Sequence, residues 1–225
     1  FGLAAYAEDV VFSNKAGKIL DSYSYTRMQT DISMARIPDG TGDFSVCAQP
    51  TPGYTNNNAG LMAFTATLSY GTGDVVLSEA MGANFSFLKQ PDQSYPDWIE
   101  IHNTSAQPLS LSGYALSNNA KNPAKWTFPD ISLDAGEYLC VLATGNDVRD
   151  AQKKNSLETN FGISADGEVV FLFSPEGQIL DRLQLGRARA DVSYGRTGAN
   201  LLYYDSPTPG AANTEEIFST LDEVF

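Results

Sequence analysis

The sequence predicts an all-β protein, a Greek-key sandwich or barrel, on three observations. Helical periodicity is nearly absent along the chain. Short runs of β-branched and aromatic residues alternate with clusters of Gly, Pro, Asn and Asp about every ten residues, which is typical of short strands joined by turns. Part of this strand-like sequence occurs twice, at a constant offset of 160 residues and without a gap.

The repeat relates residues 1–36 to residues 161–196. The two segments share 13 identities in 36 positions, where average composition gives roughly two by chance. The identical residues of the first segment are Phe1, Gly2, Ala5, Glu8, Val10, Gly17, Ile19, Leu20, Asp21, Arg27, Asp31, Ser33 and Arg36. After a slip of three residues the match resumes, with Pro50-Thr51-Pro52-Gly53 against Pro207-Thr208-Pro209-Gly210 and Asn56 against Asn213.

Only the second copy has strand-like sequence ahead of it, about 85 residues that begin at Asp74. The sequence therefore predicts the back half of one module followed by one complete module. The predicted domains are a C-terminal half-module at 1–57, a linker with a possible strand at 58–73, a complete module at 74–213, and an acidic tail or the start of a next linker at 214–225.

Nine strands are predicted in the complete module. They cover residues 75–80, 98–103, 109–116, 125–128, 137–143, 168–173, 178–185, 192–196 and 201–205, with turn residues between them. In the second strand Ile99 and Ile101 alternate with polar neighbours, the pattern of a strand with one face on a core. Trp126 and Phe128 share a face two residues apart, and we expect them to close the core against Tyr114 and Tyr138.

The linker and the tail each carry an apolar run. Residues 61–70 are apolar and prone to form a strand, so we expect them to pack on the half-module or to pair with a sheet edge. In the tail, four acidic residues alternate with apolar ones, which fits a short helix or the beginning of another linker.

Composition limits the partners. With 27 acidic and 14 basic residues the net charge is −13, which repels phosphate backbones and acidic lipids, so we expect no nucleic-acid partner. No stretch approaches the length of a membrane-spanning helix, and we expect no membrane insertion in this segment.

Cysteine content indicates the redox state and the compartment. Cys47 and Cys140 fall in different predicted modules, so two unpaired, half-buried thiols are expected. Low cysteine content with abundant Tyr, Asn, Thr, Gly and Asp fits an exported bacterial protein whose secretion signal is removed or lies outside these residues.

Five motifs occur in a fixed order in the predicted complete module. They are Tyr95-Pro-Asp-Trp-Ile-Glu-Ile-His-Asn103, Leu111-Ser-Gly-Tyr-Ala-Leu116, Lys125-Trp-Thr-Phe-Pro129, Leu133-Asp-Ala-Gly-Glu-Tyr138, and Ser193-Tyr-Gly-Arg196 with Pro207-Thr-Pro-Gly-Ala-Ala-Asn213. Residues 74–213 thereby resemble the bacterial form of the lamin tail domain, and residues 1–57 resemble its second half. The resemblance implies an immunoglobulin-like β-sandwich. It also implies an accessory, non-enzymatic module of an exported or cell-surface protein, often in tandem or fused to an enzyme domain. In nuclear lamins the related domain docks partners that include DNA, a role that the acidity of this chain argues against.

No catalytic or cofactor-binding residue is assigned. The chain has one histidine and none of the usual hydrolase, phosphate-binding or metalloprotease motifs. His102 near Glu100 is the only candidate acid–base pair, and a surface or edge histidine is the favoured interpretation.

Duplicated charges are a second candidate site. The pairs are Asp21 with Arg27 and Asp31 with Arg36, repeated as Asp181 with Arg187 and Asp191 with Arg196. They either mark a ligand site or, as we favour, are carboxylates that fix turns or pair with arginine inside a sandwich.

Calcium is the one ion that the sequence leaves open, and no cofactor is otherwise predicted. Oxygen-rich loops at 39–43, 92–97 and 130–134 could supply ligands, but none has the EF-hand spacing, so no metal ligand is assigned.

We predict a non-enzymatic structural or adhesive module that makes protein–protein contacts or assembles with copies of itself. One alternative is glycan binding on an exposed platform of Trp98, Tyr95 or Tyr203. Another is a targeting appendage of a larger exported enzyme. A further hypothesis is that another chain completes the open sheet edge of residues 1–57 by strand addition, against the simpler view that Phe1 is only a boundary of the fragment.

Overall fold

The chain folds into two compact units, Phe1–Thr67 and Leu68–Phe225, called unit 1 and unit 2 below. The computed structural model describes residues 2–4, 6–27, 32–47, 49–68, 70–198 and 200–213. Strands dominate both units, which confirms the predicted all-β class. Within these residues no helix has the length and apolar character that crossing a membrane requires.

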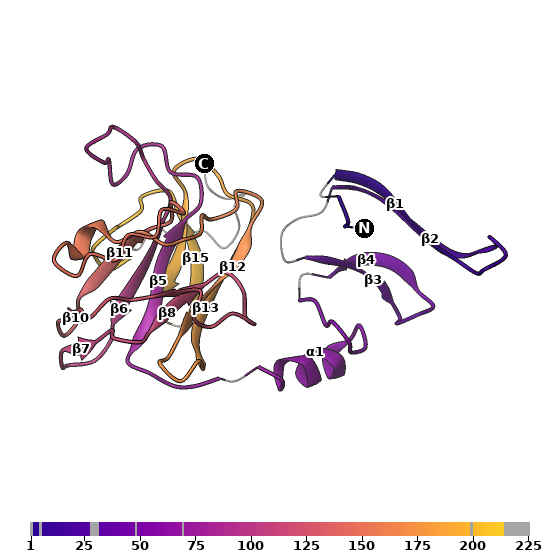
Figure 1. Ribbon diagram of the computed structural model, residues 1–225, viewed down its shortest axis with the longest axis horizontal. Helices are drawn as coiled ribbons and strands as arrows, with labels where there is room; N and C mark the ends of the chain where they lie inside the picture. The colour runs from indigo at the N-terminus through magenta and orange to yellow at the C-terminus, as the bar shows by residue number, and fades with distance from the viewer. Residues whose placement is uncertain are drawn as a thin grey trace. The chain divides into compact units, whose positions relative to one another are not determined.

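Unit 2 consists of two main antiparallel sheets (Figure 1). The five-stranded sheet has the order β11 (Tyr138–Leu142), β6 (Trp98–Asn103), β5 (Val75–Met81), β14 (Ser193–Thr197) and β15 (Asn200–Tyr204). The four-stranded sheet has the order β13 (Ile179–Leu185), β12 (Glu168–Phe173), β8 (Ala115–Ser117) and β9 (Trp126–Thr127). A small sheet pairs β7 (Leu109–Ser110) with β10 (Ser132–Leu133), and a 3-10 turn covers Lys154–Ser156.

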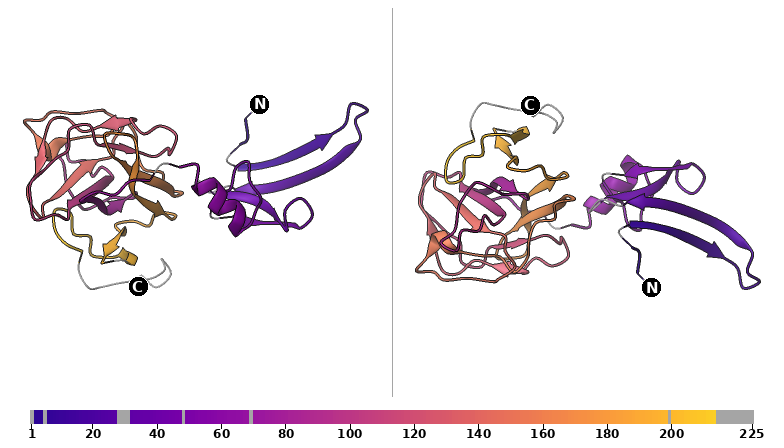
Figure 2. Two further views of the ribbon diagram at one scale, coloured as in Figure 1. Left: turned by 90° about the horizontal axis from the view of Figure 1, so that it is seen from below. Right: turned by 90° about the horizontal axis from the view of Figure 1, so that it is seen from above.

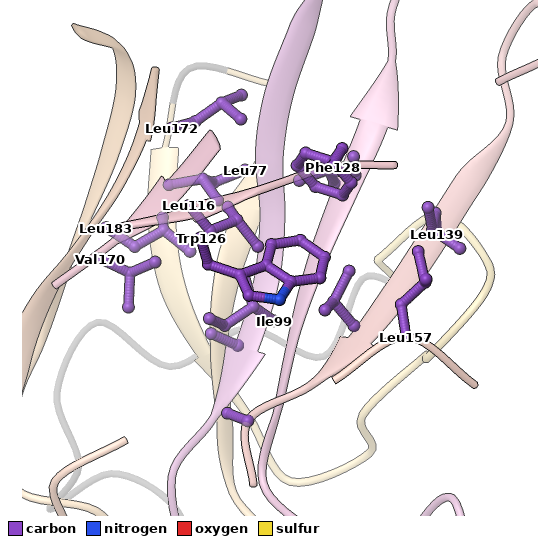
Figure 3. Packing of buried hydrophobic residues seen from close by; sticks show 14 of the residues in the cluster. Leu77, Ile99, Leu116, Trp126, Phe128, Leu139, Leu157, Val170, Leu172 and Leu183 are labelled. Atoms are coloured by element: carbon purple, nitrogen blue, oxygen red, sulfur yellow. The ribbon is translucent and has the colours of Figure 1, made fainter. Parts of the chain in front are cut away.

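The main core of unit 2 lies between these two sheets. Trp126 of β9 is fully buried there and is surrounded by side chains of both sheets (Figure 3). Ile99 comes from the five-stranded sheet, and Val170 and Leu183 come from the four-stranded sheet. Phe128 packs edge-on against Trp126, with ring centroids 4.9 Å apart. Two sheets that share one apolar core form a β-sandwich of the immunoglobulin-like type, as predicted.

The predicted strands of unit 2 are all observed, with two differences. The predicted strand at 109–116 is two strands, because a turn at Gly113, with φ of +83°, separates β7 from β8. The positive φ explains the break, since glycine adopts it without strain. The two-residue strand β10 was missed because it is too short to show any alternation.

Strand β6 is buried on both faces, whereas one buried face was predicted. Ile99 and Ile101 lie in the main core as expected. On the opposite face Trp98 is fully buried with Met81 and Leu142. Tyr138 does not close the main core, because it pairs with His102 and therefore lies on this second face.

Unit 1 contains two antiparallel hairpins. Strand β1 (Tyr6–Ser13) pairs with β2 (Ile19–Arg27), and β3 (Ser33–Ile37) pairs with β4 (Asp43–Cys47). The first hairpin, drawn in indigo, runs as a long twisted ribbon in both views of Figure 2. Tyr23 of β2 and Phe44 of β4 bring the hairpins together, with ring centroids 4.1 Å apart.

The predicted strand in the linker was partly wrong. Residues Asn58–Thr65 form helix α1, which Asn57 caps by accepting a hydrogen bond from the Gly60 amide at 2.9 Å. The cap and a run of helix-forming Leu, Met and Ala override the apolar strand-like pattern. Beyond the helix, Tyr70 forms a single parallel bridge to Ile179 of β13, so this end of the run does pair with a sheet edge. The predicted helix or linker at 214–225 lies outside the described residues.

Candidate functional site

The two copies of the repeat fold into the same first hairpin. Phe12 pairs with Asp21 in the first copy, and Leu172 pairs with Asp181 at the equivalent place in the second. Both hairpins also carry an irregularity at the same position, Phe12/Ser13 and Leu172/Phe173. Residues 1–57 and 161–213, called the first copy and the second copy below, therefore share register as well as sequence.

Each copy closes its two hairpins with one ion pair. Arg36 contacts Asp21 at 2.6 Å, and Arg196 contacts Asp181 at 2.8 Å. In unit 2 this pair spans the sandwich, since Asp181 is on β13 and Arg196 on β14 of the other sheet. Arg36 also lowers the pKa of Asp21 by hydrogen bonding to its carboxylate.

The predicted partners of these charges were therefore wrong, although the structural interpretation holds. Arg196 pairs with Asp181 and not with Asp191, because the packing of the two sheets brings β13 and β14 together across the sandwich. Asp191 instead fixes a loop, accepting hydrogen bonds from the amides of Phe85 at 2.7 Å and Ser86 at 3.0 Å. The Arg27 side chain and Asp31 lie outside the described residues.

Two fully buried acids lie side by side in unit 2. Glu79 of β5 and Glu100 of β6 are opposite each other in the sheet, and both are 0% exposed. Glu79 accepts hydrogen bonds from the Ser193 hydroxyl and from the Thr208 amide, the latter at 3.2 Å. Glu100 accepts one from the Gly210 amide. The acids thereby hold the segment after β15 against the sheet.

Burial shapes the proton affinity of this cluster. Desolvation raises the pKa of Glu79, and it raises the pKa of Glu100 to about 7, with a smaller contribution from the charge of Glu79. Desolvation also raises the pKa of the Cys140 thiol, which donates to Glu100 at 3.2 Å. Because both carboxylates are sealed from solvent, they act here as hydrogen-bond anchors for the chain itself.

His102 does not form an acid–base pair with this cluster. Its ring stacks on Tyr138, with centroids 3.9 Å and planes 5° apart, and partial burial lowers its pKa. It is partly exposed on β6, an inner strand of the five-stranded sheet, and is therefore a surface histidine and not an edge histidine.

Of the three aromatic residues predicted as a glycan-binding platform, one is buried. Trp98 is 0% exposed, so it cannot present a surface to a sugar. Tyr95 and Tyr203 are partly exposed, and Tyr203 packs on Tyr194 with ring centroids 4.7 Å apart.

The cysteines are free and partly exposed, as predicted. In two of the three proposed calcium loops, 39–43 and 92–97, aspartates accept hydrogen bonds from the chain itself: Asp39 from the Asn56 side chain, Asp92 from the Ser94 amide and Asp97 from the Asn84 backbone amide. In the described part of the chain, no three His, Cys, Asp or Glu side chains gather in a way that could hold a metal. Calcium binding stays a prediction.

Unit 1 exposes residues whose counterparts form the core of unit 2. Phe12 is 66% exposed, whereas Leu172 is 0% exposed at the equivalent position. Val10 is 36% exposed against 0% for Val170, and Ile19 is 59% exposed against 2% for Ile179. In unit 2, residues 70–160, called the front half below, supply the side chains that cover Val170 and Leu172 in the main core, whereas Ile179 packs with Phe173 and Ala115 on the other face of the sheet.

A comparison with known protein families places this architecture. The family model for the Lamin Tail Domain matches residues 69–187, the stretch from the start of unit 2 through β13. The chain belongs to the lamin tail domain family. No curated protein matches it. The match lies in the lamin tail module of unit 2 and leaves the repeat in unit 1 outside it.

The buried acid pair escaped prediction from the sequence. Glu79 stands in the run Val75-Val-Leu-Ser-Glu-Ala-Met81, where a charge interrupts an apolar strand. That interruption was the available signal, since a glutamate is almost never fully buried unless it is hydrogen-bonded. What the sequence lacked was the identity of the donors, which follow more than 100 residues later.

Proposed function

We propose that this chain is a non-catalytic structural or adhesive module that makes protein–protein contacts in an exported or cell-surface bacterial protein. The observation that carries the proposal is the open side of unit 1. Val10 and Phe12 lie two residues apart on one face of β1 and expose surface that their counterparts Val170 and Leu172 bury in the main core of unit 2. Exposed apolar surface of this kind is typical of a protein contact. Partners are other polypeptides or copies of this chain; nucleic acid is disfavoured by the net charge of −13.

Membership in the lamin tail domain family supports a non-enzymatic role, since the immunoglobulin-like sandwich serves widely as an interaction module. The acids in unit 2 support it too, because both oxygens of Glu79 and the Oε2 atom of Glu100 accept hydrogen bonds from the chain itself. Composition supports export, and a tandem arrangement of modules is supported by the repeat.

Sedimentation velocity over a wide range of protein concentration tests the proposed contact. The wild-type chain is expected to self-associate as concentration rises, and Phe12→Asp is expected to weaken this association by placing a charge on the open side. The matched control is Phe85→Asp in unit 2, which makes the same change at a side chain of equal exposure, 66% in both cases. A chain that stays monomeric throughout, or one that both variants affect equally, contradicts the proposal.

A further inference from the structure

Unit 1 contains a hollow of about 440 Å³ beside its ion pair. Apart from two prolines, six residues that line it recur unchanged in the second copy. These residues, called the cradle below, are Asp21, Ser33, Arg36, Thr51, Gly53 and Asn56, equivalent to Asp181, Ser193, Arg196, Thr208, Gly210 and Asn213. In unit 2 every one of the six counterparts binds strand β5 or β6, so the second copy indicates what the cradle is shaped to hold.

Three of the counterparts bind the backbone of β5. Asp181 accepts a hydrogen bond from the Leu77 amide at 2.9 Å, and Arg196 donates to the Leu77 carbonyl at 3.5 Å. Asn213 donates to the carbonyl of Ser78 at 3.2 Å. These contacts fix the register of an extended strand without regard to its side chains.

The other three counterparts bind the acidic side chains of β5 and β6. The Ser193 hydroxyl and both the amide and hydroxyl of Thr208 donate to Glu79. The Gly210 amide donates to Glu100 on the next strand. Hydrogen bonds to a carboxylate are stronger than neutral ones, so this set of donors selects an acidic strand.

The cradle already has the internal geometry of its counterpart. Thr51 donates to the Asn56 side-chain oxygen at 3.3 Å, and Thr208 donates to Asn213 at 3.0 Å. Asn56 donates to the Arg36 carbonyl at 3.2 Å, matching 2.8 Å between Asn213 and the Arg196 carbonyl. A site that is formed in advance loses little conformational entropy when its ligand binds.

We propose that the cradle binds the front half of a lamin tail module through a β5-type strand that carries a glutamate at the position of Glu79. This inference rests on the proposed function in taking the open side of unit 1 as a protein contact. The occupant is a front half that has no back half of its own. An intact copy of this chain does not fit, because its β5 is already held by its own second copy and an exchange would expose as much surface as it buries.

Ala35, beside the cradle, affects how closely a β5-type strand can approach it. Ala35 stands where the second copy has Gly195, and a Cβ at Gly195 would lie 2.8 Å from the Ser78 carbonyl oxygen and 2.8 Å from the Asn213 side chain. A strand with the backbone path of β5 must therefore shift to pass Ala35. The Ala35→Gly variant is expected to accept the front half of this chain at least as well as the wild type.

The test places residues 70–160 of this chain directly ahead of Phe1 in the full chain. Residue 160 precedes Phe161 in unit 2, so the junction reproduces the natural connection of a front half to its back half. Amide hydrogen exchange in β1–β4 is then compared between the extended and the original chain. Exchange is expected to slow by about a hundredfold or more in the extended chain, with and without Ala35→Gly.

Thr51→Val and its counterpart Thr208→Val provide the matched controls. If Thr51 binds the glutamate, Thr51→Val is expected to speed exchange in β3 by about tenfold in the extended chain and to have no such effect in the original chain. Thr208→Val is expected to loosen β14 in both proteins, because Glu79 is bound there in both.

The inference is overturned if neither extended protein, wild type or Ala35→Gly, gains protection in β1–β4. It is overturned as well if Thr51→Val acts equally with and without the added front half, which would reduce Thr51 to its bond with Asn56. Protection that rises with protein concentration supports the inference, with the front half bound between chains. If the original chain stays monomeric in sedimentation but the extended chain gains protection in β1–β4, the proposed function is contradicted and the inference about the cradle stands.

Discussion

The first and second copies of the repeat adopt the same hairpin but differ in what covers it. Phe12 and Leu172 occupy one position of one hairpin, yet their exposed fractions are 66% and 0%. The turn and the irregularity are the same in both, so they are fixed by local sequence. The burial of Leu172 comes from the front half, which packs on the second copy within unit 2. The comparison separates the energetics of a hairpin from the energetics of its core.

The largest expected difference between the copies comes from shortening an apolar side chain. Leu172→Ala is expected to lower the free energy of unfolding of unit 2 by about 2–5 kcal/mol, because it leaves a cavity in the main core. Phe12→Ala in unit 1 is expected to cost under about 0.5 kcal/mol, since the ring is mostly in solvent. Urea unfolding followed by tryptophan fluorescence measures the first change, as both tryptophans are in unit 2. Hydrogen exchange in β1 and β2 measures the second, and equal costs would contradict the comparison.

A second difference is the buried acid pair of unit 2, which has no equivalent among the described residues of unit 1. The pKa of Glu100 is about 7 in the folded protein, above its ordinary value of 4.5, so the folded state holds the proton more tightly. Protonated Glu100 is therefore expected to contribute about 3 kcal/mol to the stability of unit 2 below about pH 4.5, and this contribution is lost as the pH rises to about 7.

Glu100→Gln removes this titration while keeping an oxygen for the Gly210 amide. The variant is expected to show a flatter dependence of unfolding free energy on pH and to be the more stable protein above about pH 7. Tryptophan fluorescence in urea at a series of pH values measures both proteins. Identical slopes in the wild type and Glu100→Gln would show that another group controls the dependence. Among the described residues of unit 1, no carboxylate accepts a hydrogen bond from Thr51 or Gly53, so protection of the β1–β4 amides, corrected for the intrinsic pH dependence of exchange, is expected to lack this dependence.

Much of this fold was predictable because its signals are local. The strands of the second copy follow from apolar alternation between turn residues, and the repeat carried the same elements into unit 1. Helix α1 was not predicted, because the short apolar run at residues 61–64 fits a strand as well as a helix, and the cap at Asn57 favours the helix.

The candidate site was far less predictable, because its contacts are remote in sequence. The retention of Asp21 and Arg36 in both copies showed that they matter, but their pairing depends on how β2 and β3 pack. The donors to Glu79 are on β14 and after β15, and no residue near β5 in the sequence indicates which groups they are. Only the comparison between copies in the folded chain showed that Ser33, Thr51 and Gly53 repeat the same donors.

The smallest expected effect tests where the copies should be equal. Gly17 and Gly177 close the same hairpin turn with φ of +78° and +77°. In both turns a side chain accepts two amides, Asn14 from Ala16 and Lys18, and Ser174 from Glu176 and Gln178. A Cβ at Gly17 meets nothing within 4 Å, and one at Gly177 makes only an ordinary contact of 3.5 Å with Pro123.

Gly17→Ala and Gly177→Ala are therefore each expected to cost about 1 kcal/mol, which is the strain of a left-handed alanine. Hydrogen exchange measures the local cost in β1–β2 and in β12–β13. Equal costs would show that the turn is independent of the front half. A larger cost in unit 2 would mean that packing transmits the strain of the turn into the core, and the hairpin would then no longer be a unit whose energetics are set locally in both copies.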